Sequence, residues 1–592
     1  MNLMKNLLIY SIYSIALIFV FVQFGSSLPV ETPQCLDIKN PLKMSEAKAV
    51  PCPYRKTAHI LTSGLQWVVL YGFVAEQMMN EHKIPTILII GAGPGGLTLA
   101  HSIQKNLNSF EKKFNIKIFD REISPNGKWQ GYHITLNNTG VKSLFNCIPE
   151  SISSRLHEVV LDNKLEHQEH HSSCLYDHKG NVLFKTPGYQ VKNIYEFNKL
   201  NNMFTLIVTF RDRLRDLLLE GIDVKWGKKC IGYHEDDDNV WAIFDDGTRE
   251  RGDLLIGADG IHSPIRKQKI PELKINHLGI TQCCADITPN KELMDRMLSI
   301  TGNSLCQVTM GPKGDCTFLM FRLFPIDSND NNNNETSYYR VSFAYSYPSE
   351  NHEKNDNWTY KDDELPTSKF PDDENPEFVF NDIKKRIKEN RPKGKLTDIF
   401  LEFWDLAKSR IENDHENCYP LRRRPLRDID PGSVDQWETT RVTLLGDAIH
   451  AMNPWVGIGT NSAIEDAELL TNALANWSKD NWKEHIRNYE LGLRGRGSFY
   501  IDLTRTSCIK KHQICDGFLS IMIRNFMFRF NYVIAYIKSC WYGDRKERGM
   551  MRQKIQIMGR TSHDGKERAN VNKKITNYEY GDGKERDDIS KK

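Results

Sequence analysis

Three glycines, Gly91, Gly93 and Gly96, form the pattern G-x-G-x-x-G between two apolar segments. In this pattern the first glycine permits a tight turn, the second lets backbone approach a pyrophosphate, and the third lets a helix pack closely on a strand. Residues 85–90 have the composition of a short buried strand, and residues 97–107 are compatible with a helix. The N-terminus of that helix would face the ligand with unpaired N–H groups. The segment therefore predicts a phosphate-binding turn.

A carboxylate follows the next predicted strand. Residues 116–119 are apolar enough to form a second buried strand, and Asp120 comes directly after them. An acidic side chain at this place accepts hydrogen bonds from a ribose, although the gap from Gly96 exceeds the roughly 20 residues usual for the fingerprint. Strand, helix and carboxylate together favour dinucleotide binding over a simple packing turn.

Two later segments repeat the arrangement of a buried strand that ends in a carboxylate. Asp259 follows the strand-like residues 254–256 at a turn flanked by glycines, although Asp-Gly is also an ordinary turn dipeptide. Asp447 follows the strand-like residues 442–445, and a glycine-rich loop then leads into a helix over about residues 462–474. A helix N-terminus there offers partial positive charge to an electron-rich ring.

These three segments, in this order, resemble the class A FAD-dependent monooxygenases, the family of p-hydroxybenzoate hydroxylase and many fungal hydroxylases, over about residues 84–474. The resemblance implies that the ADP half of FAD is held by Gly91, Gly93, Gly96 and Asp120. It implies that Arg211, Asp259 and Gln130 lie near the cofactor, with Asp259 also helping nicotinamide binding. It further implies that Asp447 binds the ribityl chain and that the isoalloxazine is lined by Pro454, Gly457, Gly459, Thr460 and Asn461.

The resemblance also implies a reaction. NADPH or NADH reduces FAD, O2 adds to give a flavin C4a-hydroperoxide, and oxygen passes to a small aromatic or lipophilic substrate by hydroxylation or epoxidation. No second G-x-G-x-x-G segment follows, as expected for a nicotinamide that docks transiently. Two alternatives stay open: a flavin-dependent oxidase or reductase on the same fold, and a membrane-anchored flavin-binding protein without turnover.

No protein side chain is assigned as the catalyst, because the flavin supplies the chemistry. His262 and His450 are explained by the loops that contain them, and Glu465 and Asp466 are interpreted as partners of a helix N-terminus. The 13 cysteines are odd in number and have no metal-ligand spacing, which favours a reducing compartment and no metal. A net charge of +3 gives no reason to expect nucleic acid as a partner.

The predicted fold is α/β (α+β), with a Rossmann-like FAD-binding domain, an antiparallel-sheet substrate domain and C-terminal helices. The monooxygenase core covers residues 84–475, with FAD parts at about 84–160, 205–270 and 436–475 and substrate parts at about 161–204 and 271–435. The other predicted divisions are a hydrophobic anchor or signal segment at 1–27, a linker at 28–83, C-terminal helices at 476–543 and a disordered charged tail at 544–592.

Two apolar segments suggest a membrane. Residues 7–24 form an uncharged run of 18 residues, close to the roughly 20 that a spanning helix needs. We expect an anchor with a cytosolic catalytic body; the alternatives are a cleaved signal peptide that directs the chain to the secretory pathway, or a foreign extension on a cytoplasmic enzyme. Residues 518–537 carry one polar face, which predicts a helix packed on the body or lying on a membrane surface. No feature of the sequence indicates an oligomeric state.

Overall fold

The computed structural model describes residues 34–36, 49–51, 84–107, 113–125, 133–160, 173–186, 193–200, 206–325, 337–349, 376–413, 421, 423–475, 477–478, 481–515 and 517–541. The predicted anchor, Gln130 and the charged tail lie outside these residues. The chain divides into two units, Met1–Lys83 and Ile84–Lys592. In the first unit, β1 (Gln34–Leu36) pairs antiparallel with β2 (Ala49–Pro51). All other described elements belong to the second unit.

A five-stranded sheet forms the centre of the second unit, with the order β19-β13-β3-β4-β9. All four neighbouring pairs are parallel. Because both faces of such a sheet are covered, its strands are apolar throughout, as the sequence TILII of β3 illustrates. The strands span β3 (Thr86–Ile90), β4 (Asn115–Phe119), β9 (Val224–Lys225), β13 (Leu254–Gly257) and β19 (Val442–Leu444).

Helices α3 (Pro94–Asn106), α8 (Arg211–Leu219) and α15 (Gly459–Leu474) pack with this sheet in one apolar core. The core-facing stripe of α3 includes Leu97, Ala100 and Ile103, spaced three residues apart as a helix requires. A hairpin sheet, β10 (Cys230–Glu235), β11 (Val240–Phe244) and β12 (Arg249–Gly252), adjoins it. Gly247, at φ +80°, forms the predicted turn between the last two strands.

A seven-stranded sheet forms the second part of this unit, with the order β18-β14-β17-β16-β15-β6-β7. The predicted antiparallel pairing is present throughout except between β6 and β15, which are parallel. Its strands are β6 (Ser173–Asp177), β7 (Val182–Lys185), β14 (Asn276–Ile287), β15 (Cys306–Met310), β16 (Cys316–Pro325), β17 (Ser337–Pro348) and β18 (Arg423–Asp428).

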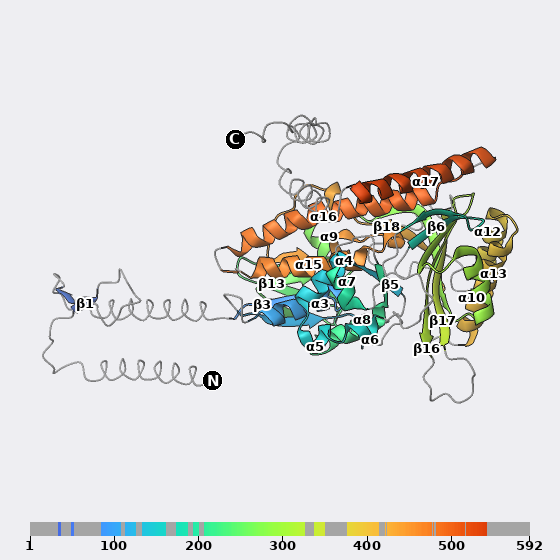
Figure 1. Cartoon of the computed structure of the whole chain (residues 1–592). Helices are drawn as coiled ribbons and strands as arrows, with labels where there is room; N and C mark the ends of the chain where they lie inside the picture. Colours follow the sequence, from blue (N-terminus) through green and yellow to red (C-terminus); the bar gives the residue numbers. More distant parts are fainter. Residues whose placement is uncertain are drawn as a thin grey trace, which may run out of the picture. The chain divides into compact units, whose positions relative to one another are not determined.

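Three helices cover the outer face of the large sheet, on the right of Figure 1: α10 (Lys291–Thr301), α12 (Pro376–Asn390) and α13 (Lys395–Asn413). Phe343 of the sheet packs on Trp404 of α13 with ring centroids 4.8 Å apart. The sequence reasoning assigns residues 271–435 to the substrate part but predicts neither α12 nor α13 within it.

Two long helices, α16 (Trp482–Lys511) and α17 (Gly517–Trp541), run along the upper side of the second unit in Figure 1 and correspond to the expected C-terminal helices. Within the described part of the chain, no helix combines the length and apolarity needed to cross a bilayer. The remaining elements are β5 (His133–Asn137), α4 (Asn138–Cys147), α5 (Glu150–Ser153), α6 (Leu156–Val159), α7 (Ile194–Lys199), β8 (Leu206–Phe210), α9 (Pro264–Lys269), η2 (Pro431–Ser433), α14 (Asp447–His450) and η3 (Pro454–Val456).

Candidate functional site

The parallel sheet brings the predicted carboxylates to one edge. Asp120 follows β4, Asp259 lies just after β13, and Asp447 lies just after β19. Backbone hydrogen bonds continue past the strand ends, from Ala258 N to Ile90 O at 2.8 Å and from Leu445 N to Gly257 O at 2.9 Å. Since parallel strands share the direction of their carboxyl ends, these side chains and the glycine turn after β3 face the same crevice, where open α/β sheets bind ligands.

The glycine turn is built as its spacing predicts. Gly91 has φ +116°, and a Cβ there would lie 2.2 Å from the carbonyl oxygen of Ala258. A Cβ on Gly96 would lie 2.1 Å from the oxygen of Gly91, so helix and strand meet closely. By contrast, a Cβ on Gly93 would meet only the guanidinium of Arg211, at 3.8 Å. Gly93 therefore borders open space beside a cation, which fits a phosphate group.

Asp120 ties β4 to the glycine turn. Its Oδ2 accepts a hydrogen bond from Ala92 N at 2.7 Å, and its Oδ1 accepts one from Glu122 N at 2.9 Å. The side chain also lines the cavity beside the turn. Since each carboxylate oxygen has two lone pairs, a ribose hydroxyl can still donate to Asp120.

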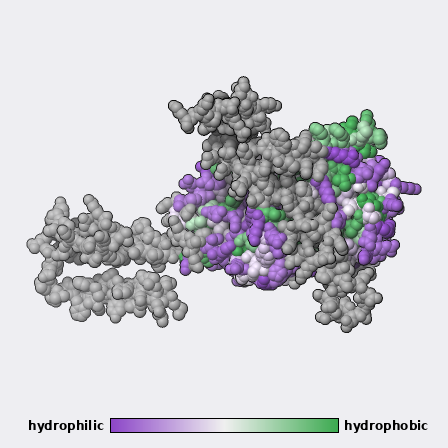
Figure 2. All heavy atoms as spheres, viewed as in Figure 1, coloured by the Kyte–Doolittle hydropathy of each residue, from purple (hydrophilic) through white to green (hydrophobic). Residues whose placement is uncertain are grey.

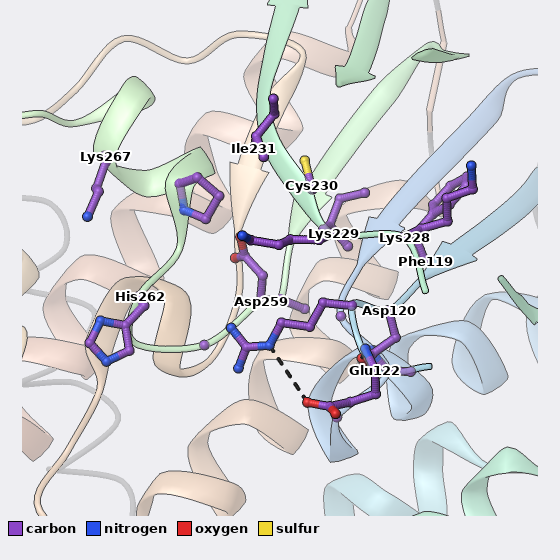
Figure 3. Close-up of a pocket in the computed structure, with 18 of the residues that line it drawn as sticks. Phe119, Asp120, Glu122, Lys228, Lys229, Cys230, Ile231, Asp259, His262 and Lys267 are labelled. Carbon is purple, nitrogen blue, oxygen red and sulfur yellow. Dashed lines mark hydrogen bonds and ion pairs between the residues drawn. The ribbon is translucent and has the colours of Figure 1, made fainter. Parts of the chain in front are cut away.

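That cavity has a volume of about 580 Å³ and lies between the glycine turn, the start of β10 and the loop after β13. Figure 3 shows Asp120, Lys229 and Asp259 around the same space. Six cationic side chains line it against three carboxylates, an excess that suits an anionic pyrophosphate. The cations are Arg121, Arg211, Arg215, Lys228, Lys229 and Lys267, and the carboxylates are Asp120, Glu122 and Asp259.

Arg215 is a residue of this site that the sequence reasoning did not single out. It lies one helical turn after Arg211 on α8, and its Nε donates to Ala92 O at 3.0 Å. Its Nη1 donates to Pro125 O at 2.8 Å. Its spacing from Arg211 could have indicated it, because residues four apart share one face of a helix. Arg215 therefore holds the turn while Arg211 faces the open space near Gly93.

The carboxylate of Asp259 is enclosed in the cavity wall. Among the described residues, neither oxygen has a partner at full hydrogen-bond distance and angle, and Ser263 is a weak neighbour at most. Burial raises the pKa of this carboxyl to about 6, although Ser263 and the charge of Arg266 oppose the shift. A buried acceptor without a donor is costly, so the site fits a ligand that brings hydroxyl or amide donors.

His262 lines the same cavity on the side of Lys267 (Figure 3). Burial lowers the pKa of its imidazole to about 4, and the neighbouring cation Arg427 acts in the same direction. The ring is therefore neutral near pH 7 and holds no extra proton to give to a reacting group.

Asp447 occupies the first position of α14, and Gly459 opens α15 beside it. An ideal Cβ on Gly459 would lie 3.8 Å from Asp447 Oδ1. The Asp447 side chain is exposed, and the protein around it nevertheless raises the pKa of its carboxyl by desolvation, against the charges of His450 and Arg211. An accessible, partly desolvated carboxylate beside a helix N-terminus can accept hydrogen bonds from a polyhydroxyl chain.

His450 is part of the scaffold beneath this carboxylate. It is fully buried, and its Nε2 lies 2.6 Å from Asp466 Oδ2. The same oxygen accepts a hydrogen bond from Gly446 N at 2.9 Å, and Arg496 pairs with the other oxygen. The sequence suggested that Asp466 is a partner of the α15 N-terminus, and this interpretation is wrong. Asp466 instead fixes the turn that presents Asp447.

The predicted ring-lining loop follows directly. Pro454 is exposed, Thr460 is half-buried, and Gly457 turns the chain with φ +67°. The amide of Asn461 is engaged with its neighbours: its Nδ2 donates to Gly457 O and Thr135 O, and its Oδ1 accepts from Asn137 N. Asn461 thus fastens the loop to β5 through its side chain. Pro454 and Thr460 are the more accessible residues of the loop.

A polar chain that the sequence reasoning missed links β5 to the large sheet. His133 Nδ1 lies 2.5 Å from Ser342 Oγ, which donates to Asp286 Oδ1 at 2.8 Å. Arg340 and Arg410 each donate to the other oxygen of Asp286 at 3.0 Å. These residues are far apart in sequence and carry no short motif, so only the folded sheet brings them together.

Comparison with known proteins agrees with this geometry. Residues 421–490, which include Asp447 and Asn461, match the family model described as an FAD binding domain. The chain is 27% identical over 433 residues to the FAD-dependent monooxygenase thnD of Trichoderma harzianum, covering 71% of this chain and 92% of that protein. It is 26% identical to the FAD-dependent monooxygenase adaC of Aspergillus niger, covering 66% and 84% respectively. Over about two thirds of its length, the chain is therefore similar to FAD-dependent monooxygenases.

Solved structures share the fold of this chain. A putative FAD-containing monooxygenase from Photorhabdus luminescens superposes with a TM-score of 0.53 at 22% identity, covering 72% of this chain and 97% of that one. A single-residue variant of Klebsiella pneumoniae HpxO, complexed with FAD, superposes with a TM-score of 0.54 at 18% identity, covering 77% and 98%. The predicted combination of a parallel FAD-binding sheet with a second sheet and helices is thus confirmed.

Proposed function

We propose that this chain is an FAD-dependent monooxygenase that uses NADPH or NADH together with O2 to hydroxylate or epoxidise a small aromatic or lipophilic organic molecule. One observation carries the proposal: the loop expected to line the flavin ring lies between the nucleotide-binding sheet and the large sheet. Trp455 of that loop packs on Phe318 of β16 with ring centroids 5.9 Å apart. A substrate bound between the loop and the large sheet would meet an apolar, aromatic surface.

The residues of the site fit FAD. Gly93, Arg211 and the cationic cavity would hold the pyrophosphate, Asp120 the adenosine ribose, and Asp447 the ribityl chain. Gly457, Gly459 and Thr460 would border the ring, with Pro454 beside it. The bound flavin would supply hydride acceptance and oxygen activation. The protein would position the ring, hold its polar edge at the α15 N-terminus and exclude water.

Nicotinamide binding is proposed to be transient. The buried carboxylate of Asp259 supports this, because it lies in the wall of the cofactor cavity and its oxygens have acceptor capacity for a ligand. His450 is held by Asp466, and His262 is neutral near pH 7. Neither is therefore assigned a proton-transfer step, and the work of the chain is binding and shielding.

We further propose that the catalytic body lies in the cytosol. The chain has 13 cysteines, an odd number without metal-ligand spacing, and this pattern suits a reducing compartment. The N-terminal apolar run remains the proposed anchor.

Substrate screening with isotope analysis tests the proposed reaction. The full chain, loaded with FAD, is incubated with NADPH or NADH and a panel of aromatic and lipophilic compounds under ¹⁸O2. We expect consumption of the reduced nicotinamide to rise with a substrate and one ¹⁸O atom to enter the product. Hydrogen peroxide as the only product across the panel would favour the oxidase alternative. A flavoprotein that consumes no reduced nicotinamide would contradict the proposal.

A further inference from the structure

Helix α17 exposes a stripe of large apolar side chains. Phe518 is 82% exposed and Phe526 is 62% exposed. The stripe, called here the α17 stripe, repeats at helical spacing and consists of Phe518, Leu519, Met522, Ile523, Phe526, Met527 and Phe530. Figure 2 shows it as the green area over α17 at the upper right. An exposed apolar surface of this kind marks an interaction site.

The opposite side of α17 is already used to hold the helix on the body. Arg524 is only 4% exposed, and its Nη1 donates to Gly311 O at 2.8 Å. Phe528 packs against the core cluster that contains Trp455 and Cys508. The helix is therefore docked by one face, and the α17 stripe points outward as a result.

The charge around the stripe identifies the occupant. Between Gly517 and Trp541 the helix has no Asp or Glu, while it carries Arg524, Arg529 and Lys538. The following residues 542–562 contain six Lys or Arg against two Asp or Glu. A second copy of the chain would bring the same uncompensated positive charge to a shared interface. An anionic lipid surface is complementary to both the charge and the apolar stripe.

We propose that the α17 stripe docks this enzyme on an anionic membrane, with α17 lying in the plane of the interface. The aromatic and aliphatic side chains would enter the boundary between headgroups and acyl chains. Arg529, which is exposed on α17, would meet the headgroups. This attachment is separate from the N-terminal apolar run and needs no helix that crosses the bilayer.

Hydroxyl-radical footprinting of the full chain tests the proposal at the stripe itself. The probe is a vesicle of phosphatidylcholine and phosphatidylserine, and modification is read by mass spectrometry of each peptide. We expect vesicles to lower the modification rates of Phe518, Met522 and Phe526 at least threefold. Ile123, which is 82% exposed, and Phe378, which is 43% exposed, should react as before. Vesicle-bound protein whose stripe reacts as fast as in solution would overturn the proposal, because another segment would then hold the membrane.

A paired variant and two further conditions separate the occupants. Met522→Glu with Phe526→Glu should abolish the protection of Phe518, whereas Ile123→Glu should leave it intact. Equal protection by vesicles of phosphatidylcholine alone would overturn the anionic preference. Protection that grows with protein concentration in the absence of vesicles would assign the stripe to a second copy of the chain and overturn the membrane proposal.

Discussion

His450 Nε2 lies 2.6 Å from Asp466 Oδ2, and both side chains are buried beneath the turn that presents Asp447. Asp466 comes from α15 and also accepts a hydrogen bond from Gly446 N. Because Arg496 of α16 pairs with the same carboxylate, two helices fix one turn. The position of Asp447, which is proposed to bind the ribityl chain, therefore depends on a buried ionic network.

Replacing Asp466 by Asn should destabilise the FAD-free chain. The change leaves Arg496 and His450 without their carboxylate, and breaking a buried ion pair costs about 3–5 kcal/mol. Denaturant unfolding measures the loss. Glu465→Gln is the matched control, because Glu465 is 21% exposed and lies 3.6 Å from the same arginine, so its effect should be small. Equal stability of Asp466→Asn and wild type would contradict a stabilising role for this buried ionic network.

The carboxyl group of Asp466 should also make the stability of the folded chain depend on pH in acid. Burial opposes the charged form of Asp466, but His450 and Arg496 outweigh it and lower the pKa to about 2 from 3.8. A lowered folded-state pKa contributes stability above the unfolded value, and this contribution is lost as pH falls through the folded value. The stability difference between wild type and Asp466→Asn should therefore shrink between about pH 4 and pH 2. If the difference in the free energy of unfolding stays constant between pH 4 and pH 2, the charge of Asp466 is not its cause.

Two glycine variants should separate folding from cofactor binding. Gly91→Ala places a Cβ 2.2 Å from Ala258 O at φ +116°, so we expect a loss of stability of about 2 kcal/mol or more. Gly93→Ala meets no chain atom closer than 3.8 Å and should fold normally. Its methyl group enters the space proposed for the pyrophosphate, so FAD affinity should fall at least tenfold. Isothermal titration and thermal unfolding read the two effects, and normal FAD affinity in Gly93→Ala would place the phosphates elsewhere.

Asp447→Ala should weaken FAD binding by at least tenfold without unfolding the chain. Its carboxyl is desolvated in the FAD-free protein, so its removal should leave stability unchanged or slightly higher. Fluorescence titration with FAD gives the affinity. The exposed Asp435 supplies a control, and Asp435→Ala should bind FAD normally. Unchanged affinity and turnover in Asp447→Ala would refute its role.

Asp259→Asn should stabilise the FAD-free chain near pH 7. The folded pKa of about 6 exceeds the ordinary value of 3.8, so the folded state holds the proton more tightly and wild-type stability falls as pH rises through that range. The variant lacks this loss, which amounts to about 1–3 kcal/mol above pH 6. Thermal unfolding at pH 4 and pH 7 measures it, with the exposed Asp245→Asn as control. Parallel pH dependence in variant and wild type would contradict the burial of this charge.

The same variant should raise the KM for NADPH or NADH several-fold if Asp259 receives the nicotinamide cofactor. Steady-state kinetics at saturating substrate would show this, with kcat less affected than KM. An unchanged KM would remove Asp259 from nicotinamide binding and leave its effect on stability intact.

Local patterns predicted the parts of the fold that depend on neighbouring residues. The turn from Gly91 to Gly96 and the strand that precedes Asp447 could be predicted because periodicity and glycine spacing specify them. The contacts of His133 with Ser342, and of Asp466 with Gly446, could not. The first contact joins residues that are distant in sequence. The second depends on the direction in which a side chain leaves its helix. Helix α12 was also missed, because the sequence reasoning assigned its residues to the substrate part without specifying their secondary structure.

FAD titration of the full chain tests the central claim most directly, because it needs no knowledge of the substrate. The chain is stripped of bound flavin and titrated with FAD while absorbance and fluorescence are followed. The convergence of Gly93, Asp120, Asp259 and Asp447 at one sheet edge predicts saturation at one FAD per chain and the visible spectrum of oxidised flavin. A folded, colourless protein that shows no saturable FAD binding would contradict it.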